Sequence, residues 1–298
     1  MWWKENISRR ESIAALAAAW AKAALAAAPG SLPIGVQLYA VRGLLRKDAD
    51  TTLQSLAAAG FKDLEGYARG QSLALAPKAA QQGLKIRACP AETPLITNNW
   101  DPYPDLRPVT LPAAIDSVAA AGIEYLTMGY VDPGARGDGD DFYRRTADRM
   151  NAVAELCRKS GVKFAFPNHA FEFAGRPGAR PIDIYRERLD PKLVPLELDV
   201  FWASVAGEDP LRILKDWKNR VALLRLNDKS KDTPRQFEER IGQGAYVEIG
   251  SGDIDFAAIL KAAAAAGAKL CFVGQDGNTD DPIASLRHGL AALSSHAR

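Results

Sequence analysis

Short apolar runs followed by segments of helical periodicity recur along this chain, and their alternation constrains the fold more than any other feature. Eight such runs can be read from the sequence. They are 34–38, 62–65, 84–88, 124–128, 162–166, 194–199, 220–225 and 269–273. Segments between them, such as 51–59, 113–121 and 142–160, carry apolar residues at three- and four-residue spacing. Strands that alternate with helices predict a parallel sheet with helices packed against it.

A glycine ends several of the helical segments directly before the next apolar run. Glycine supplies the left-handed residue that stops a helix and turns the chain back. The positions are Gly60, Gly122, Gly161 and Gly267. Eight repeated units predict one closed (β/α)8 TIM barrel over 31–298, a length typical of that fold. An open doubly wound sheet is the alternative, although no Gly-x-Gly-x-x-Gly follows an early strand to support a nucleotide-binding version.

The first thirty residues differ in composition from the rest and predict a signal segment over 1–30. A positively charged start containing Arg9 and Arg10 leads into an Ala-rich stretch that ends at Pro29 and Gly30. This order is typical of a secretory signal, and the arginine pair is typical of the twin-arginine route. We therefore expect export of an already folded protein, to the periplasm. An Ala-rich amphipathic helix with a chance arginine pair is the alternative.

The charge balance and the cysteine count exclude several classes of protein. The chain has 38 basic and 36 acidic residues, a formal net charge of +2. This is too balanced for a dedicated nucleic-acid binder. No uncharged apolar run of about 20 residues predicts a membrane span. Cys89, Cys157 and Cys271 are too few and too scattered for a disulfide framework or a zinc cluster. We expect a small-molecule partner, while the oligomeric state stays open.

Polar side chains gather where the predicted strands end, which is where TIM barrels carry their active sites. Charged residues inside an apolar strand are costly unless they are paired. Asp199 and Arg225 interrupt two such strands, so we expect them to meet in one pocket. His169 follows the fifth run and is the only histidine before the last helical segment. The same rule therefore favours a pocket-facing His169 over a structural one.

At these residues the chain resembles the xylose-isomerase-like TIM-barrel family of sugar phosphate isomerases and epimerases. The resemblance runs from about 34 to 293 and is carried by the segments 35–42, 151–173, 198–202, 247–256, 272–278 and 281–287. It implies one divalent cation (Mn, Mg, Co or Zn), held by two Glu, one Asp and one His at four strand ends. It also implies a sugar or polyol whose vicinal oxygens bind the cation while carboxylates move a proton on the adjacent carbon.

The sequence departs from that pattern at half of the metal ligands. Glu172 and Asp199 match two of them. Arg225 stands where the family has His, and Gly274 stands where it has the final Glu. A guanidinium keeps its charge and does not ordinarily bind metal. We therefore expect the cation to be absent or weakly bound, with Arg225 as the counter-charge to Glu172 and Asp199.

If the match slips in the eighth strand, Gln275 or Asp276 would supply a metal ligand instead. Trp202 fits a sugar-stacking aromatic, although a tryptophan at a strand end is equally a barrel cap. Lys229 fits a contact to an anionic substrate or a plain salt bridge. The residues expected to contact substrate are Glu65, Glu92, Asn168, Trp202, Asp228, Lys229 and Gln275, with ordinary exposed loop carboxylates as the alternative for the two glutamates.

Two functions fit this sequence. The first is a sugar isomerase or epimerase, or a keto-sugar lyase, that transfers a proton next to a carbonyl. The resemblance then makes Glu172, Asp199 and His169 the acid–base and binding groups, with Arg225 as the electrophile in place of a metal. The second is a non-catalytic exported relative that has lost the metal site and binds carbohydrate or a partner protein.

Overall fold

Eight parallel strands close into a barrel, as the alternating pattern predicts. The computed structural model describes residues 32–103, 109–136, 139–238, 240–277 and 279–296. The barrel strands are β1 (Ile34–Gln37), β2 (Asp63–Glu65), β3 (Lys85–Pro90), β4 (Tyr125–Thr127), β5 (Lys163–Pro167), β6 (Leu196–Asp199), β7 (Val221–Leu226) and β10 (Leu270–Val273). Each overlaps one of the eight apolar runs, so the predicted single-domain TIM barrel is confirmed.

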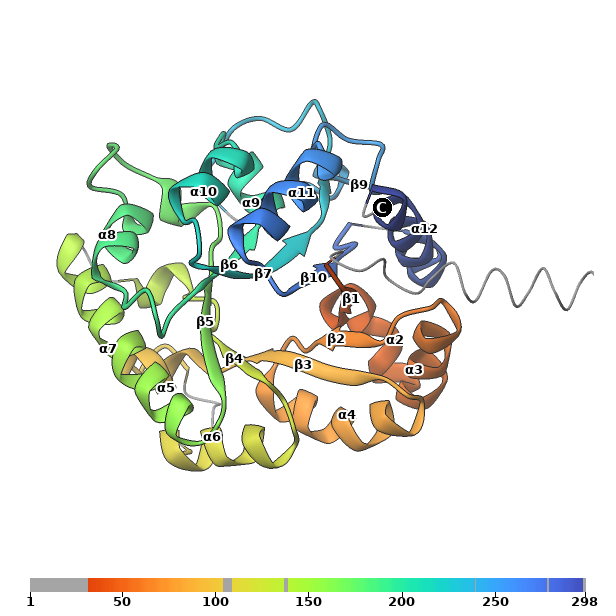
Figure 1. Ribbon diagram of the computed structural model, residues 1–298, viewed down its shortest axis with the longest axis horizontal. Coiled ribbons are helices and arrows are strands. Elements are labelled where there is room, and N and C mark those ends of the chain that lie inside the picture. Colours follow the sequence, from red (N-terminus) through yellow and green to blue (C-terminus); the bar gives the residue numbers. More distant parts are fainter. Residues whose placement is uncertain (1–31, 104–108, 137–138, 239, 278, 297–298) are drawn as a thin grey trace, which may run out of the picture.

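Helices surround the barrel (Figure 1), and short 3-10 turns lie at several strand ends. The helices are α2 (Arg42–Lys47), α3 (Ala49–Ala58), α4 (Arg69–Gln81), α5 (Thr93–Thr97), α6 (Leu111–Ala120), α7 (Asp140–Lys159), α8 (Pro181–Arg188), α9 (Val200–Val205), α10 (Pro210–Asp216), α11 (Phe256–Ala266) and α12 (Pro282–His296). The turns are η1 (Leu38–Val41), η2 (Pro133–Ala135), η3 (Phe171–Phe173) and η4 (Gln243–Ala245). The glycines predicted to end helices all have positive φ, at Gly60, Gly122, Gly161 and Gly267. Left-handed backbone is what lets the chain reverse there into the next strand.

The barrel closes between its first and last strands. Ile34 of β1 pairs with Cys271 of β10, and both strands run parallel. Side chains fill the barrel interior, where Tyr125, Leu223 and Phe272 pack together and are almost fully buried. The barrel is therefore a packed core, and in this fold the active site lies where the strands end.

The long segment between β7 and α11 contains a small hairpin. Strands β8 (Asp228–Lys229) and β9 (Tyr246–Val247) pair antiparallel, with Asp228 opposite Val247. This hairpin raises Tyr246 beside the carboxyl ends of the barrel strands, where it becomes part of a pocket wall.

The predicted signal segment at 1–30 lies outside the described residues. Among the helices that are described, none combines the length and the apolar character that crossing a bilayer would take.

Candidate functional site

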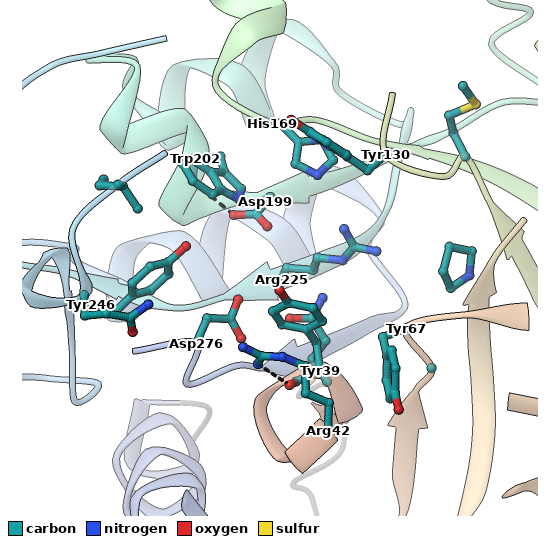
Figure 2. Close-up of a pocket in the computed structure, with 16 residues that line it drawn as sticks. Tyr39, Arg42, Tyr67, Tyr130, His169, Asp199, Trp202, Arg225, Tyr246 and Asp276 are labelled. Carbon is teal, nitrogen blue, oxygen red and sulfur yellow. Dashed lines mark hydrogen bonds between the residues drawn. The ribbon is translucent and has the colours of Figure 1, made fainter. Parts of the chain in front are cut away.

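A cavity of about 480 Å³ opens at the carboxyl ends of the barrel strands. This size is typical of small-molecule sites. Figure 2 shows side chains from many strand ends converging on it. They are Gln37, Tyr39, Arg42, Tyr67, Tyr130, His169, Asp199, Trp202, Arg225, Gln243, Tyr246 and Asp276, with Gly66, Pro90, Met128 and Ile241 completing the wall. Four of the site residues expected from the sequence are among them, His169, Asp199, Trp202 and Arg225, together with Asp276, the alternative metal ligand.

Arg225 lies at the centre of this site, on the next-to-last residue of β7. Its Nε donates to both carboxylate oxygens of Glu65 at 2.9 and 3.1 Å, and its Nη2 donates to Glu65 as well. Nη2 is also 3.3 Å from Glu197. Burial opposes the charged guanidinium, but Glu197 and Glu65 outweigh it and raise the pKa of Arg225. Arg225 is thus a fixed cation, and Nη1 is its one nitrogen without a hydrogen bond to the described residues.

The expected partners of Arg225 were Glu172 and Asp199, and its observed ion pairs are with Glu65 and Glu197. Asp199 shares a register row with Arg225 in neighbouring strands. The long arginine side chain nevertheless extends across the barrel mouth to β2, where Glu65 ends the strand. Pairing with a fully buried carboxylate satisfies both charges where water cannot.

Glu197 was not identified as a site residue from the sequence, although its spacing from Asp199 could have indicated it. It stands two residues before Asp199 in β6, and alternate residues of a strand point to the same side. Both carboxyl oxygens are buried without a hydrogen-bond partner among the described residues. Burial raises the pKa of Glu197 well above its usual range, and Glu65 adds to the rise, although Arg225 opposes it. Glu197 therefore holds a proton more readily than an exposed glutamate does, beside the ion pair of Arg225 and Glu65.

Asp199 is the last residue of β6 and the N-cap residue of α9. Its Oδ1 accepts a hydrogen bond from the Trp202 N–H at 3.1 Å, which caps the helix and fixes the carboxyl at the cavity. Burial raises the pKa of Asp199 to about 7, although Arg225 and the Trp202 N–H oppose the rise. This carboxyl therefore exchanges a proton close to neutral pH.

Asp276 follows β10 and is a second carboxyl in the cavity wall. The Asn227 amide donates to its Oδ2 at 3.4 Å, whereas Oδ1 is buried without a hydrogen-bond partner among the described residues. Burial raises the pKa of Asp276 to about 6, against the lowering by Arg42 and Arg225. From the sequence, Asp276 was considered only as an alternative metal ligand. In Figure 2 it and Asp199 flank Arg225 from opposite sides.

His169 follows β5 and faces the cavity beside Tyr130. The two rings meet edge to face with centroids 4.9 Å apart, and Phe171 stacks on the histidine at 6.1 Å. Burial lowers the pKa of His169 to about 3, and Arg225 and Arg136 add to the lowering. The imidazole is therefore neutral at physiological pH, so it can donate one hydrogen bond and accept another.

Aromatic rings form much of the remaining wall, from Trp202 and Tyr246 on one side to Tyr39 and Tyr67 on the other (Figure 2). Tyr246 is held by parallel stacking on Phe201, with centroids 4.1 Å apart. The tyrosines were missed from the sequence because they lie in loops, in the turn η1 and in the two-residue strand β9, none of which gives a periodic signal. Aromatic faces beside polar groups suit ligands that present both C–H and hydroxyl surfaces.

The side chains at this site do not fit a resident divalent cation. Within the described ranges, no group of three or more His, Cys, Asp or Glu side chains is placed to hold a metal ion. Arg225, expected from the resemblance to stand where the family has a histidine, is a guanidinium paired with Glu65. At Gly274, where the resemblance implied a glutamate in other members, a Cβ would lie 2.5 Å from the Asn227 amide nitrogen. The space above Gly274 is therefore filled by Asn227.

Three other residues singled out from the sequence make structural contacts. The Glu172 carboxylate accepts from the His169 backbone N–H at 2.8 Å, in η3, and is not part of the cavity wall. Asn168 bridges β5 and β6, donating to the Asp199 carbonyl and accepting from its N–H. Glu92 forms a two-point ion pair with Arg69.

The last three predicted substrate contacts lie around the β8–β9 hairpin. Asp228 accepts backbone N–H groups of the following loop, including Gly250 and Gly252 at 2.8 and 2.9 Å. Lys229 pairs with Asp253 at 2.7 Å, which is the salt-bridge alternative. Gln275 lines a different cavity, on the far side of Tyr246.

The comparisons with known proteins agree with this geometry. The model of the xylose isomerase-like TIM barrel family matches residues 54–296. The chain belongs to this family. Among curated members, an inosose dehydratase of Clostridium perfringens is 28% identical over 129 residues, 41% of this chain and 43% of that protein. One from Geobacillus thermodenitrificans is 29% identical over 133 residues, 42% of this chain and 44% of that protein. The chain thus matches these xylose isomerase-like relatives over less than half of their length.

Solved structures of the family share the fold over most of the chain. A sugar phosphate isomerase/epimerase from Parabacteroides distasonis superposes with a TM-score of 0.70 at 20% identity, covering 89% of this chain and 94% of that one. A 3-keto-D-glucoside 4-epimerase from E. coli superposes with a TM-score of 0.65 at 13% identity, covering 89% of this chain and 99% of that one. At these identities the likeness shows the xylose isomerase-like fold alone.

Proposed function

We propose that this protein transfers a proton next to the carbonyl of a sugar or polyol without a metal, as an isomerase, epimerase or lyase. The observation that carries the proposal is the pair Asp199 and Asp276, two buried carboxyls with pKa values near neutrality on either side of Arg225. Groups poised near the working pH are the best acid–base catalysts. The relatives named inosose dehydratase and 3-keto-D-glucoside 4-epimerase support a sugar-like substrate.

The two pKa values assign the roles. At pH 7 Asp276 is mostly ionised and acts as the base that removes the proton from the carbon beside the carbonyl. The electron pair moves onto the carbonyl oxygen, and Nη1 of Arg225 stabilises the negative charge that forms there. Asp199, about half protonated, returns a proton to carbon or to oxygen, or to a departing hydroxyl group that leaves as water. In each case the number of protons and the total charge are balanced.

Neutral His169 and the aromatic wall would position the substrate. The imidazole bonds a hydroxyl without adding charge beside Arg225, and the rings of Trp202 and Tyr246 cover the faces of the sugar. Export to the periplasm by the twin-arginine route belongs to the same proposal, supported by the arginine pair at Arg9 and Arg10.

Hydrogen exchange tests the proposal. The protein is incubated with a panel of keto-sugars and inososes in heavy water, after treatment with a chelator, and loss of the proton signal beside the carbonyl is followed by NMR. We expect exchange with at least one sugar, and a rate lowered about 100-fold or more in Asp276→Asn because the base is lost. Glu155→Gln, an exposed carboxylate on α7, is the matched control and should exchange normally.

Sugar binding with no exchange would contradict catalysis and assign the chain to the non-catalytic alternative, which the replaced ligands at Arg225 and Gly274 favour. Exchange that stops with the chelator and returns with Mn²⁺ would contradict the metal-free mechanism.

A further inference from the structure

A second cavity, of about 690 Å³, opens on the other side of Tyr246 from the site described above. Tyr246 lines both cavities and so forms their shared wall. The loop after β10 packs directly against Tyr246, and a Cβ at Gly277 would lie 2.7 Å from the Tyr246 Cβ. Stacking on Phe201 keeps the ring in place. The two cavities are therefore neighbours across one fixed side chain.

Gln275 is the residue of this cavity that most clearly indicates a ligand site. The residue is only 7% exposed, and its amide makes no hydrogen bond to any residue that the structure describes. Its amide nitrogen and oxygen are nevertheless not fully buried, so they reach the cavity that Gln275 lines and can bind a ligand there. A hydroxyl group in the cavity would accept from the amide nitrogen and donate to its oxygen.

The other lining groups define the class of ligand. Ser251 and Thr279 offer hydroxyls, while Glu248 and Asp280 offer carboxylates, and no Lys, Arg or His is among the lining residues. Phosphate or carboxylate would meet repulsion without a counter-charge. A neutral polyhydroxyl group satisfies all five side chains and can lie against the ring of Tyr246.

The inner pocket also favours a neutral substrate. Arg225 is already paired with Glu65. The other arginine in its wall, Arg42, lies 3.8 Å over the Tyr39 ring and donates to the Tyr39 carbonyl. Asp199 and Asp276 bring negative charge to the same wall.

We propose that the second cavity is an outer subsite for the non-reacting sugar ring of a neutral glycoside whose reacting ring occupies the inner pocket. This inference rests on the proposed function. It makes a disaccharide or polyol glycoside the preferred ligand over the corresponding free sugar.

Calorimetric titration with matched pairs of sugars tests the subsite. The pairs are D-glucose with cellobiose, D-galactose with lactose, and D-mannose with β-mannobiose, so that each inner ring has its extended partner. We expect at least one disaccharide to bind about tenfold more tightly than its monosaccharide. Gln275→Ala should remove that advantage and leave the Kd of the monosaccharide unchanged. Ser251→Ala, at an exposed position, should reduce the affinity advantage of the disaccharide about threefold.

Gln54→Ala, an exposed glutamine on α3, is the matched control and should leave both constants unchanged. Equal affinity within every pair, or equal weakening of both members by Gln275→Ala, overturns the subsite while the inner site stands. If no sugar of any pair binds, and no keto-sugar exchanges its proton, the proposed function fails and the subsite fails with it.

Discussion

Single residues decide the chemistry at the mouth of this barrel. Arg225 brings a permanent positive charge into a place where most of the neighbouring acids are buried. Glu65 pairs with that charge, burial raises the pKa of Glu197, and Asp199 and Asp276 have pKa values of about 7 and about 6. Burial and the nearby guanidinium thus act in opposite directions on the pKa values of Glu197, Asp199 and Asp276.

The activity should depend on pH as a narrow bell. Asp276 must be ionised to act as base, so kcat/KM rises as pH passes about 6. Asp199 must be protonated to act as acid, so kcat/KM falls as pH passes about 7. Initial rates measured from pH 4.5 to 9 should therefore peak between about 6 and 7. In Asp199→Asn the alkaline limb should disappear from the residual rate. A flat profile across that range would contradict the assignment.

At the scale of the elements, the ends of β7 and β10 fit together through Asn227 and Gly274. The Asn227 amide fills the space above Gly274, and it binds Asp276 both through its Nδ2 and by accepting the Asp276 N–H at 3.3 Å. A side chain at 274 would displace this amide and with it Asp276. The glycine at 274 and the asparagine at 227 are therefore one structural feature.

Replacing Gly274 by alanine should lower the free energy of unfolding by about 1–3 kcal/mol, because the added methyl overlaps the Asn227 amide. Adding Asn227→Ala should recover part of that loss, since the two sites are coupled. Urea denaturation measures both. Gly43→Ala in α2 is the control: its Cβ meets nothing within 4 Å, so stability should stay the same or rise slightly. Equal losses at 274 and 43, or strictly additive losses at 274 and 227, would refute the overlap.

The sequence predicted the elements well because their signals are local. Helix periodicity and terminal glycines are read within one βα unit, so all eight strands were found. His169, Asp199, Arg225 and Trp202 were placed at the pocket by the rule that barrel sites lie at strand ends. The pairing of Arg225 with Glu65 joins residues 160 positions apart, and no local pattern encodes it. Tyr246 lies in the β8–β9 hairpin and Asp276 in the loop after β10, and the positions of both depend on the finished barrel.

At the scale of the whole molecule, the barrel is a closed parallel sheet whose first and last strands must meet. Ile34 and Cys271 stand at opposite ends of the folded chain, and they pair only after every unit between them is in place. Such non-local parallel pairing forms slowly and leaves strand edges exposed until it is complete. An export route that carries folded proteins suits a chain of this kind.

Export should fail when the twin arginines are changed together. With Arg9→Lys and Arg10→Lys, the charge of the segment is kept but the paired motif is lost. In a Gram-negative host with a twin-arginine system, the unchanged protein should reach the periplasmic fraction and the double variant should remain in the cytoplasm. Fractionation followed by immunoblotting decides this. Lys4→Arg is the control and should be exported. Finding the double variant in the periplasmic fraction would rule out the twin-arginine route.

The ion pair of Arg225 and Glu65 determines how this site obtains its positive charge. A metal has to be acquired after synthesis, competes with other ions and can be taken away by whatever binds it more tightly. The guanidinium is part of the chain and keeps its charge at every physiological pH. In the proposed mechanism the electrophile is therefore part of the chain itself, so every folded molecule carries it.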